Sequence, residues 1–338
     1  MKRELKFCTV APIDNYFTWQ IHLWLESLKK LGHSNKAIVL LFEPQGRTNP
    51  KWKQIIDLYP EAEFHFYKDD GSVAPLLGTY IPILRPYCMA KYCTQFPEIA
   101  EKTVFYCDSD IIFTEKFNID HLLEDDIIYG SDTNSYISAS YFDSKVRDVL
   151  PDKLEEYNTV DVLDEAAKII GITRQICEKN NAHSIGTQYL LKNTNAEFWT
   201  NVMNKCIPLL TYLRGVNKQY FANESKGYQS WTSDMWLVLW ELWRLGYETK
   251  VVPELEFAWS PDPITKLERC TIYHNAGITG EVQDNYPCFY KGKYVGGQDP
   301  FKDTQIDIVL NHEESKKHCT WFYAKALKEL HEKYQLEY

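Results

Sequence analysis

Apolar and polar residues follow one another over the first hundred residues in a way that predicts strands and helices in turn. Short apolar runs that end at turn residues are typical of buried strands, and apolar residues at helical spacing predict helices between them. The predicted strands lie at residues 5–11, 37–42, 62–67 and 103–107, and the predicted helices at 17–31, 52–59 and 86–96. This order predicts a mostly parallel sheet covered by helices.

The pattern becomes less regular after residue 110. Residues 143–182 are polar and helical, with a helix predicted at 161–170, and we interpret them as an insertion. The other predicted elements are strands at 185–192, 250–253 and 270–273, a buried helix at 233–245, a loop-rich stretch at 275–303 and an amphipathic helix at 313–334. Because no repeat or linker interrupts the chain, we expect one domain with an insertion.

The composition is that of a globular protein, with 44% hydrophobic and 25% charged residues. The formal net charge of −10, without a block of Lys or Arg, disfavours nucleic acid as a partner, although such an average still allows a small basic patch. Nine cysteines without a CxxC pair favour buried, reduced thiols over a disulfide framework. With no signal-like segment and no helix long enough to span a bilayer, we expect a cytoplasmic protein.

Two carboxylates, Asp108 and Asp110, follow the predicted strand at 103–107 with only Ser109 between them. Alternation along a strand would place both on one side, and ligands of open parallel sheets gather at the carboxyl ends of strands. Two oxygen ligands at such a place suit Mg²⁺ or Mn²⁺, hard cations that also hold diphosphates. A polar turn after a strand explains the same residues, so both interpretations stay open at this point.

A run of strand–helix units that ends in Asp108-Ser109-Asp110 resembles the GT-A-fold, DxD-containing, metal-dependent glycosyltransferases. The more distant similarity is to glycogenin-like enzymes and hydroxyproline arabinosyltransferases. The resemblance implies an α/β, Rossmann-like fold with a mostly parallel central sheet flanked by helices, a helical insertion and a C-terminal helix. It implies a single catalytic domain at 1–338 that contains a nucleotide-binding half at about 1–115, the insertion at about 143–182, an acceptor- and metal-binding half at about 183–303 and a helix at about 313–335.

The resemblance also implies a metal site. Asp110 would ligate Mn²⁺ or Mg²⁺ directly, Asp108 would contact the ribose or the metal, and Ser109 belongs to the same nucleotide-binding motif. His274, in a Tyr-His-Asn-Ala-Gly segment, resembles the late histidine that completes the ligand set in many of these enzymes. An imidazole added to carboxylates suits Mn²⁺. The alternative is a histidine that is hydrogen-bonded in the core or lies on the surface.

Two further positions carry catalytic expectations from the resemblance. Asp234, in the first turn of the predicted helix at 233–245, would deprotonate the acceptor in inverting members or touch the donor sugar in retaining ones. An acid there is also stabilised by the helix dipole without any catalytic role. The strand at 185–192 resembles the one that lines the donor sugar, with Gly186 allowing close approach and Gln188 orienting the sugar, but an ordinary strand can also hold a glycine.

The remaining nucleotide-binding positions match the family only by their place in the chain. Those expected to contact the base, the ribose or phosphates are Pro12, Asp14, Asn15, Asp70, Arg85, Lys91, Lys291 and Lys293. A turn explains Asp70 equally well, and a solvated loop explains the two late lysines. After His274 the chain departs from the glycogenin-like pattern, since Ile278 begins a continuation without the expected basic and Pro-Trp residues. Retention or inversion therefore stays open.

We expect a glycosyltransferase that moves a sugar from a UDP-sugar or another nucleotide-sugar to the hydroxyl of an unidentified glycan, protein or hydroxylated nucleobase. Two alternatives remain. A haloacid-dehalogenase-like phosphatase also ends a strand in DxD, but its motif normally lies on the first strand of the domain, whereas three predicted strands come first here. A catalytically inactive nucleotide- or sugar-binding protein could keep the same scaffold.

Overall fold

The computed structural model describes residues 3–278 and 280–338 and divides into two compact units. Unit 1 comprises the chain up to Leu5, Asp69–Tyr106 and Leu122–Val252. Unit 2 comprises Lys6–Lys68, Cys107–His121 and Pro253–Tyr338. Each unit therefore combines segments that are far apart in the sequence, and the domain ranges given above stay a prediction.

Unit 2 contains three parallel strands in the order β3-β2-β1, followed along the chain by helices at the predicted places. The elements are β1 (Leu5–Pro12), α1 (Asn15–Lys30), β2 (Ala37–Glu43), α2 (Lys51–Leu58) and β3 (Glu63–Lys68). Nearly every residue of β1 and β2 is buried, as expected for parallel strands covered on both faces. The predicted strand–helix alternation is therefore confirmed in this unit.

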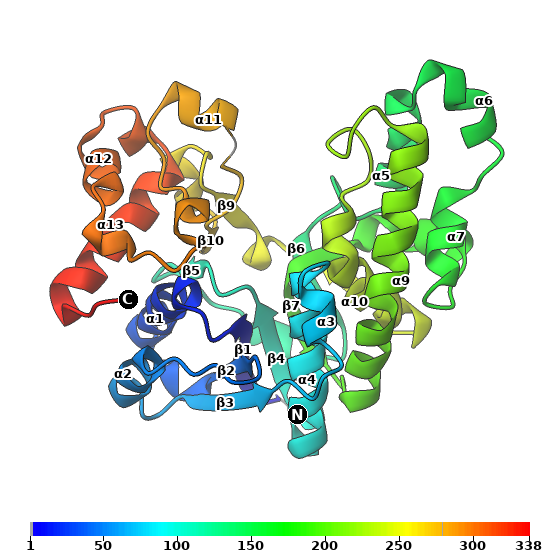
Figure 1. The fold of residues 1–338 in the computed structure, drawn as a ribbon. Coiled ribbons are helices and arrows are strands. Elements are labelled where there is room, and N and C mark those ends of the chain that lie inside the picture. Colours follow the sequence, from blue (N-terminus) through cyan, green and yellow to red (C-terminus); the bar gives the residue numbers. More distant parts are fainter. Residues whose placement is uncertain (1–2, 279) are drawn as a thin grey trace. The chain divides into compact units, whose positions relative to one another are not determined.

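A smaller sheet in unit 2 has the order β5-β10-β9, with β10 antiparallel to β5 and parallel to β9. Its strands are β5 (Ile111–Phe113), β9 (Phe257–Trp259) and β10 (Ile272–His274). The unit ends with α11 (Gly280–Asn285), α12 (Gln305–Asn311) and α13 (Cys319–Tyr334), of which α12 and α13 lie side by side (Figure 1).

The amphipathic helix predicted at 313–334 begins only at Cys319. His318 has an extended backbone, and the first backbone N–H groups of α13 donate to residues outside the helix. The Cys319 N–H bonds to the Asp262 carbonyl at 2.8 Å and the Thr320 N–H to the Ser260 carbonyl at 2.8 Å. Tertiary hydrogen bonds therefore satisfy the free N–H groups of this helix end, and they set where it starts.

Unit 1 holds the other strands of the seven-stranded main sheet, in the order β4-β7-β6-β8. These strands are β4 (Thr103–Cys107), β6 (Ile128–Asp132), β7 (Ile185–Lys192) and β8 (Thr249–Val251). The bounds of β4 and β7 agree with the predicted strands, and every residue of both is buried. β7 runs antiparallel to β4 and β6, whereas β6 and β8 are parallel, so the predicted α/β fold with a mostly parallel sheet is confirmed with β7 reversed.

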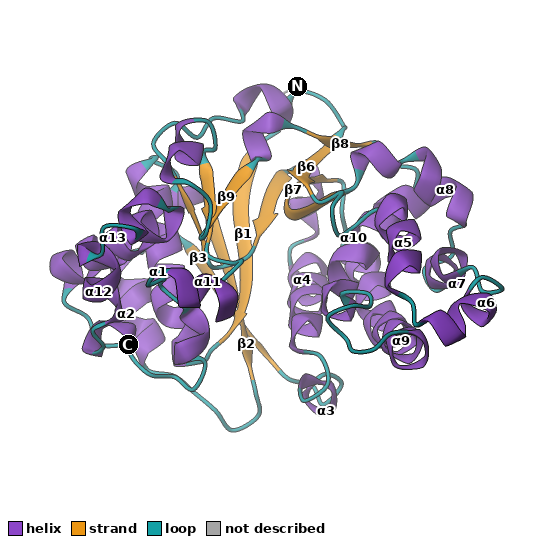
Figure 2. Cartoon of the chain, turned by 90° about the horizontal axis from the view of Figure 1, so that it is seen from above, coloured by secondary structure: helices purple, strands orange, loops and turns teal. Residues whose placement is uncertain are grey.

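The long helix of unit 1 has no counterpart among the predicted elements. α9 (Ala196–Tyr220) contains Pro208, which removes a hydrogen bond from the helix interior. The helix packs against α4 (Leu84–Gln95) and α10 (Ser233–Arg244), which lie beside it in Figure 2, and its residues Leu209, Leu210 and Leu213 are buried. Burial of this apolar face offsets the cost of the proline, an effect of tertiary packing that local propensity does not report.

The predicted insertion is helical, as expected. The helices in and next to this range are α5 (Ala139–Ser144), α6 (Leu154–Tyr157), α7 (Val162–Lys168) and α8 (Arg174–Lys179). Arg174 joins them, because its guanidinium pairs with Asp143, Asp161 and Glu178 at 2.5–3.0 Å. A further short helix of unit 1, α3 (Ala74–Leu77), precedes α4. All nine cysteines are buried. Within the described residues, none of the helices is both long enough and apolar enough to cross a bilayer.

A buried histidine in α1 makes the stability of unit 2 sensitive to acid. His22 is fully buried, its Nδ1 hydrogen-bonds the Tyr338 hydroxyl, and its ring lies 4.7 Å from that of Tyr334. Burial lowers the pKa of His22 to about 3. An unfolded histidine titrates near 6.5, so below that pH only the unfolded chain takes up the proton, and stability falls as the pH is lowered.

We predict that His22→Gln makes unfolding less sensitive to acid. Between pH 7 and pH 5 the unfolding free energy of this variant should fall by about 2 kcal/mol less than that of the wild type. Urea titrations at the two pH values measure this difference. His121→Gln, at an exposed histidine, should behave like the wild type. Equal pH dependence of His22→Gln and wild type would contradict the prediction.

Candidate metal and nucleotide site

The two motif carboxylates lie in a turn between strands. β4 ends at Cys107, Asp108 to Asp110 form the turn, and β5 begins at Ile111. In the antiparallel pair of β5 and β10, Ile111 lies opposite His274. The Asn275 N–H donates to the Asp110 carbonyl at 3.0 Å, which extends the pairing by one step. Backbone pairing thus brings the late histidine to the motif.

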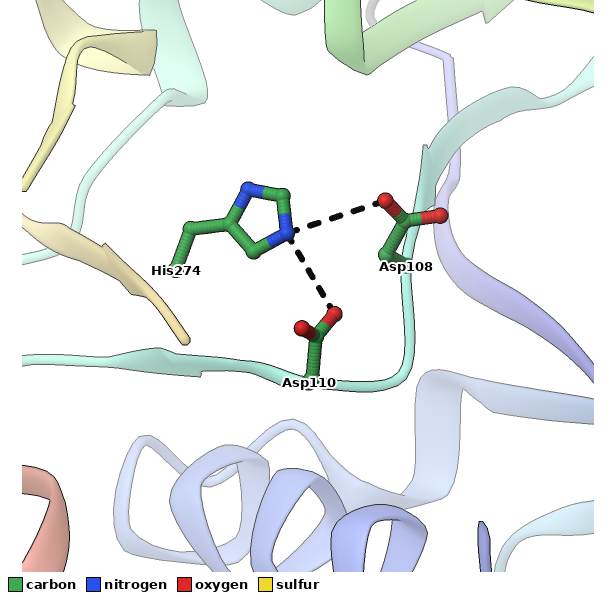
Figure 3. A group of neighbouring side chains, drawn as sticks. All are labelled: Asp108, Asp110 and His274. Carbon is green, nitrogen blue, oxygen red and sulfur yellow. Dashed lines mark ion pairs between the residues drawn. The ribbon is translucent and has the colours of Figure 1, made fainter. Parts of the chain in front are cut away.

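The structure brings the three predicted metal ligands together (Figure 3). His274 Nε2 lies 3.3 Å from Asp110 Oδ1 and 3.7 Å from Asp108 Oδ2. One candidate ligand atom from each residue lies within 4.8 Å of the others, and no second group of this kind occurs among the residues that the structure describes. The side chains of Asp110 and His274 are 5% and 8% exposed, whereas that of Asp108 is 28% exposed.

The His274 ring is held by aromatic neighbours. It stacks on Trp259, with ring centroids 5.5 Å apart and an interplanar angle of 17°, and it lies 5.6 Å from the Phe257 ring. Both aromatic residues belong to β9, which pairs with β10 in parallel. The rings of Trp259 and Phe257 hold the imidazole plane so that Nε2 lies toward the carboxylates. A metal ligand whose orientation is set by its surroundings needs less ordering when an ion binds.

A lysine forms an ion pair with one carboxylate of the cluster. Lys291 stands in a short 3-10 turn at Lys291–Tyr294, and its ammonium pairs with Asp110 Oδ2. Burial alone would raise the pKa of Asp110, but the interactions with Lys291 and His274 outweigh burial and hold that pKa well below its usual range. Burial likewise opposes the charge of Lys291, but Asp110 outweighs it and raises the pKa of the lysine. Both groups are therefore ionised.

The other predicted lysine of this turn does not join the cluster. Lys293 pairs with Asp303 at 2.5 Å, and its side chain is 51% exposed. This environment agrees with the solvated loop that the sequence left open. The two lysines of one turn thus have different carboxylate partners.

An open pocket of about 690 Å³ lies in the same unit as the cluster. Its walls are the loops that follow β1 and β2 and the segment at 295–297, and they consist of Ile13, Asp14, Asn15, Gly46, Arg47, Thr48, Asn49, Pro50, Lys51, Val295, Gly296 and Gly297. The Asn49 amide donates to the Ile13 carbonyl at 2.7 Å and to Asn15 Oδ1 at 3.0 Å, which joins the first two loops. Predicted residues Asp14 and Asn15 line the pocket, whereas Pro12 is the last residue of β1.

Sequence reasoning missed Arg47, Asn49 and Tyr16. The first two lie in a polar loop directly after the buried strand β2, and the rule that ligands gather at carboxyl ends of parallel strands could have identified them. Tyr16 follows Asn15 in α1. Burial raises the pKa of Tyr16 to about 12, while the charge of Lys291 lowers it and that of Asp110 raises it. Both charges act on the phenol, and Asn15, the residue before Tyr16, lines the pocket.

Unit 1 joins two other predicted residues to each other. Arg85 Nη2 pairs with Asp234 Oδ2 at 2.9 Å, and the Tyr80 hydroxyl donates to Asp234 Oδ1 at 2.7 Å. The Asp234 side chain is 5% exposed. Arg85, expected to contact phosphate, is therefore the counter-ion of Asp234, and both carboxylate oxygens are engaged. Tyr80 was not predicted, because nothing in its local sequence points to Asp234.

Asp70 and Lys91 also pair with each other, at 2.7 Å. Asp70 Oδ1 accepts hydrogen bonds from the Ser72 hydroxyl at 2.6 Å and from the Ser72 N–H at 3.1 Å. Both side chains are almost half exposed. These contacts agree with the turn interpretation of Asp70, and a nucleoside contact stays a prediction.

The predicted donor-sugar strand contains an irregularity. The pairing of β6 with β7 shifts register between Gly130 and Ser131, and Thr187 has a φ of 65°, which is unfavourable for a β-branched residue. Gln188 is buried, its Oε1 accepts from the Ser131 hydroxyl at 2.5 Å, and its Nε2 has no partner among the described residues. At Gly186, a Cβ would lie 2.7 Å from Thr133 Cγ2, so neighbouring side chains require the glycine.

No protein-family model matches the chain, and no curated protein matches it. Solved structures do match. The galactosyltransferase LgtC in complex with donor and acceptor sugar analogs has a TM-score of 0.46 at 9% identity, over 96% of this chain and 95% of that one. WbbM, a bifunctional glycosyltransferase in its apo form, has a TM-score of 0.45 at 11% identity, over 82% of this chain and 47% of that one.

Mouse xyloside xylosyltransferase 1, also in its apo form, has a TM-score of 0.34 at 11% identity, over 82% of this chain and 100% of that one. All three are glycosyltransferases. The match to WbbM covers less than half of that longer chain. Because each TM-score lies below 0.5, function has to be inferred from the side chains of the site itself.

We predict that Gly186→Ala lowers the unfolding free energy by about 1–3 kcal/mol, because the added methyl group would overlap Thr133 and approach Met235. Gly215→Ala is the matched control. Gly215 lies inside α9 with nothing within 4 Å of the added Cβ, so that variant should gain up to about 1 kcal/mol from helix propensity. Urea unfolding of the three proteins measures both effects. A stable Gly186→Ala would show that the strand tolerates a side chain there.

Proposed function

We propose that the chain is a glycosyltransferase that moves a sugar from a nucleotide-sugar, with a UDP-sugar as the first candidate, to the hydroxyl of an acceptor. The observation that carries this proposal is the convergence of Asp108, Asp110 and His274, with Lys291 beside them, in the unit that also holds the pocket at the ends of β1 and β2. A diphosphate needs cationic partners, and a nucleoside needs a pocket with polar walls. Both features are present in unit 2.

The ligand set fits a divalent cation. Asp108 and Asp110 offer carboxylate oxygens, and His274 offers an imidazole nitrogen with its ring plane already fixed by Trp259. Mg²⁺ prefers oxygen ligands and retained water, whereas imidazole suits transition metals, so we favour Mn²⁺. When bound, such an ion offsets the charge that develops on a departing diphosphate.

The residues of the chain then have distinct tasks. Asp14 and Asn15, on the loop that Asn49 holds by hydrogen bonds, would contact the nucleoside. The Lys291 ammonium suits the diphosphate, because a compact cation on a flexible stem binds phosphate oxygens.

Of the two roles that the family resemblance implies for Asp234, we propose the orienting one. A general base must reach the acceptor hydroxyl within hydrogen-bond distance. Asp234 is 5% exposed, and its two oxygens are already engaged by Arg85 and Tyr80. Gln188 is buried as well, and its Nε2 has no partner among the described residues, so it stays the second candidate for orienting the sugar. These features favour a reaction that retains the anomeric configuration.

We predict that UDP raises the melting temperature only when Mn²⁺ is present. A ligand at a hundred times its dissociation constant adds about 2.7 kcal/mol, which corresponds to a shift of a few degrees. Thermal unfolding with a panel of nucleoside diphosphates, each with and without Mn²⁺, measures the shift. Asp110→Asn should abolish it. Asp303→Asn should not, although Asp303 likewise accepts a lysine of the turn at Lys291–Tyr294.

The same samples distinguish the alternatives. A folded protein that responds to no nucleotide but hydrolyses a phosphate ester would be a phosphatase and would end the transferase proposal. A protein that responds to a nucleotide and Mn²⁺ but neither transfers nor hydrolyses any donor sugar would be an inactive binding protein.

A second prediction concerns stereochemistry. The sugar released from the accepted donor should first appear with the anomeric configuration that it had in the donor, because we assign Asp234 no role as a base. Proton NMR during the first minutes of donor hydrolysis, before the free sugar equilibrates, reads this configuration. Inversion would return Asp234 to the role of base.

A further inference from the structure

Lys291 contacts the carboxylate that a divalent cation would need. We propose that Lys291 couples cation binding to diphosphate binding, because it pairs with Asp110 when neither ligand is bound and releases Asp110 when a diphosphate gives the ammonium another anion. This inference rests on the proposed function, since it assigns the diphosphate as the second partner of the lysine.

Both oxygens of Asp110 already have partners. Oδ1 lies 3.3 Å from His274 Nε2, and Oδ2 pairs with the Lys291 ammonium. The carboxylate is 5% exposed, so water has little access to replace a partner that leaves. An incoming cation must therefore take Asp110 from the lysine, whereas Asp108, with 28% of its side chain exposed, is easier to reach.

Separation of Lys291 from Asp110 costs free energy if no other anion replaces the carboxylate. Its side chain is 29% exposed, and an ammonium separated from its carboxylate in a partly buried place loses more interaction than water returns. The oxygens of a diphosphate remove this penalty by offering the ammonium a new anion. A four-carbon stem lets the ammonium change partners by rotation of side-chain bonds. Cation and diphosphate should therefore bind far better together than singly.

The neighbouring lysine provides a control within the same turn. Lys293 has the same charge and stem but pairs with Asp303 at 2.5 Å and is 51% exposed. A general change of electrostatic field in this turn would affect both lysines alike. A direct exchange of partners at Asp110 concerns Lys291 alone.

The test is titration calorimetry on the full chain with Mn²⁺ alone, UDP alone, and each in the presence of the other, with the electron paramagnetic resonance signal of free Mn²⁺ as a second readout. Lys291→Met should bind Mn²⁺ alone about tenfold more tightly than the wild type, because no ammonium competes for Asp110. The same variant should bind UDP about tenfold more weakly when Mn²⁺ is present, since the phosphate contact is lost. Lys293→Met should match the wild type in both titrations.

Unchanged Mn²⁺ affinity in Lys291→Met would overturn the inference, and so would an equal gain in Lys293→Met, which would identify a field effect. Lys291→Arg, which keeps the charge, should bind Mn²⁺ alone as weakly as the wild type, and it serves as the test if Lys291→Met does not fold. A tighter Mn²⁺ affinity in Lys291→Arg would also overturn the inference. A wild type that binds neither UDP nor Mn²⁺ contradicts the proposed function itself, which separates the two failures.

Discussion

The candidate site depends on one short backbone ladder, the antiparallel pairing of β5 with β10. Ile111 directly follows Asp110 and lies opposite His274, and the Asn275 N–H reaches the Asp110 carbonyl. All residues of both strands are buried, so the ladder belongs to the core of unit 2. A slip of one residue would turn every side chain of β10 to the other face, and His274 would leave the carboxylates. The cluster is thus as stable as the core that carries it.

The fold was predictable where one local signal was strong enough to decide. β4 is an apolar run after Thr103, and β7 combines apolar residues at both of its halves with Thr187 and Gln188 between them. The predicted bounds of both strands agree with the structure. The direction of β7 was not predictable, because a fully buried run has the same pattern in either orientation. α9 was missed because its stability comes from packing on α4 and α10 despite Pro208. The start of α13 depends on hydrogen bonds to Ser260 and Asp262, which no local pattern shows.

In the candidate site too, some residues were predictable from local sequence and others were not. The spacing of Asp108 and Asp110 and the late position of His274 carry enough information to predict a cluster that the structure assembles. Partners that depend on the fold did not follow from the sequence. Arg85 is engaged by Asp234, and Lys91 by Asp70, although phosphate contacts were expected for both cations. Tyr16 and Tyr80 were not predicted, because no local pattern distinguishes them and most tyrosines only pack in the core.

Charge balance explains how two carboxylates can lie so close together. Two carboxylates within a few ångströms repel each other, and the burial of Asp110 would by itself favour its neutral form. His274 and Lys291 offset this repulsion from opposite oxygens of Asp110, so the acid stays ionised in a partly closed site. A divalent cation would supply positive charge at the same carboxylates, and a diphosphate would give the displaced ammonium another anion. The cationic group that offsets the charge of Asp110 is thus the one that the proposed exchange of partners would move.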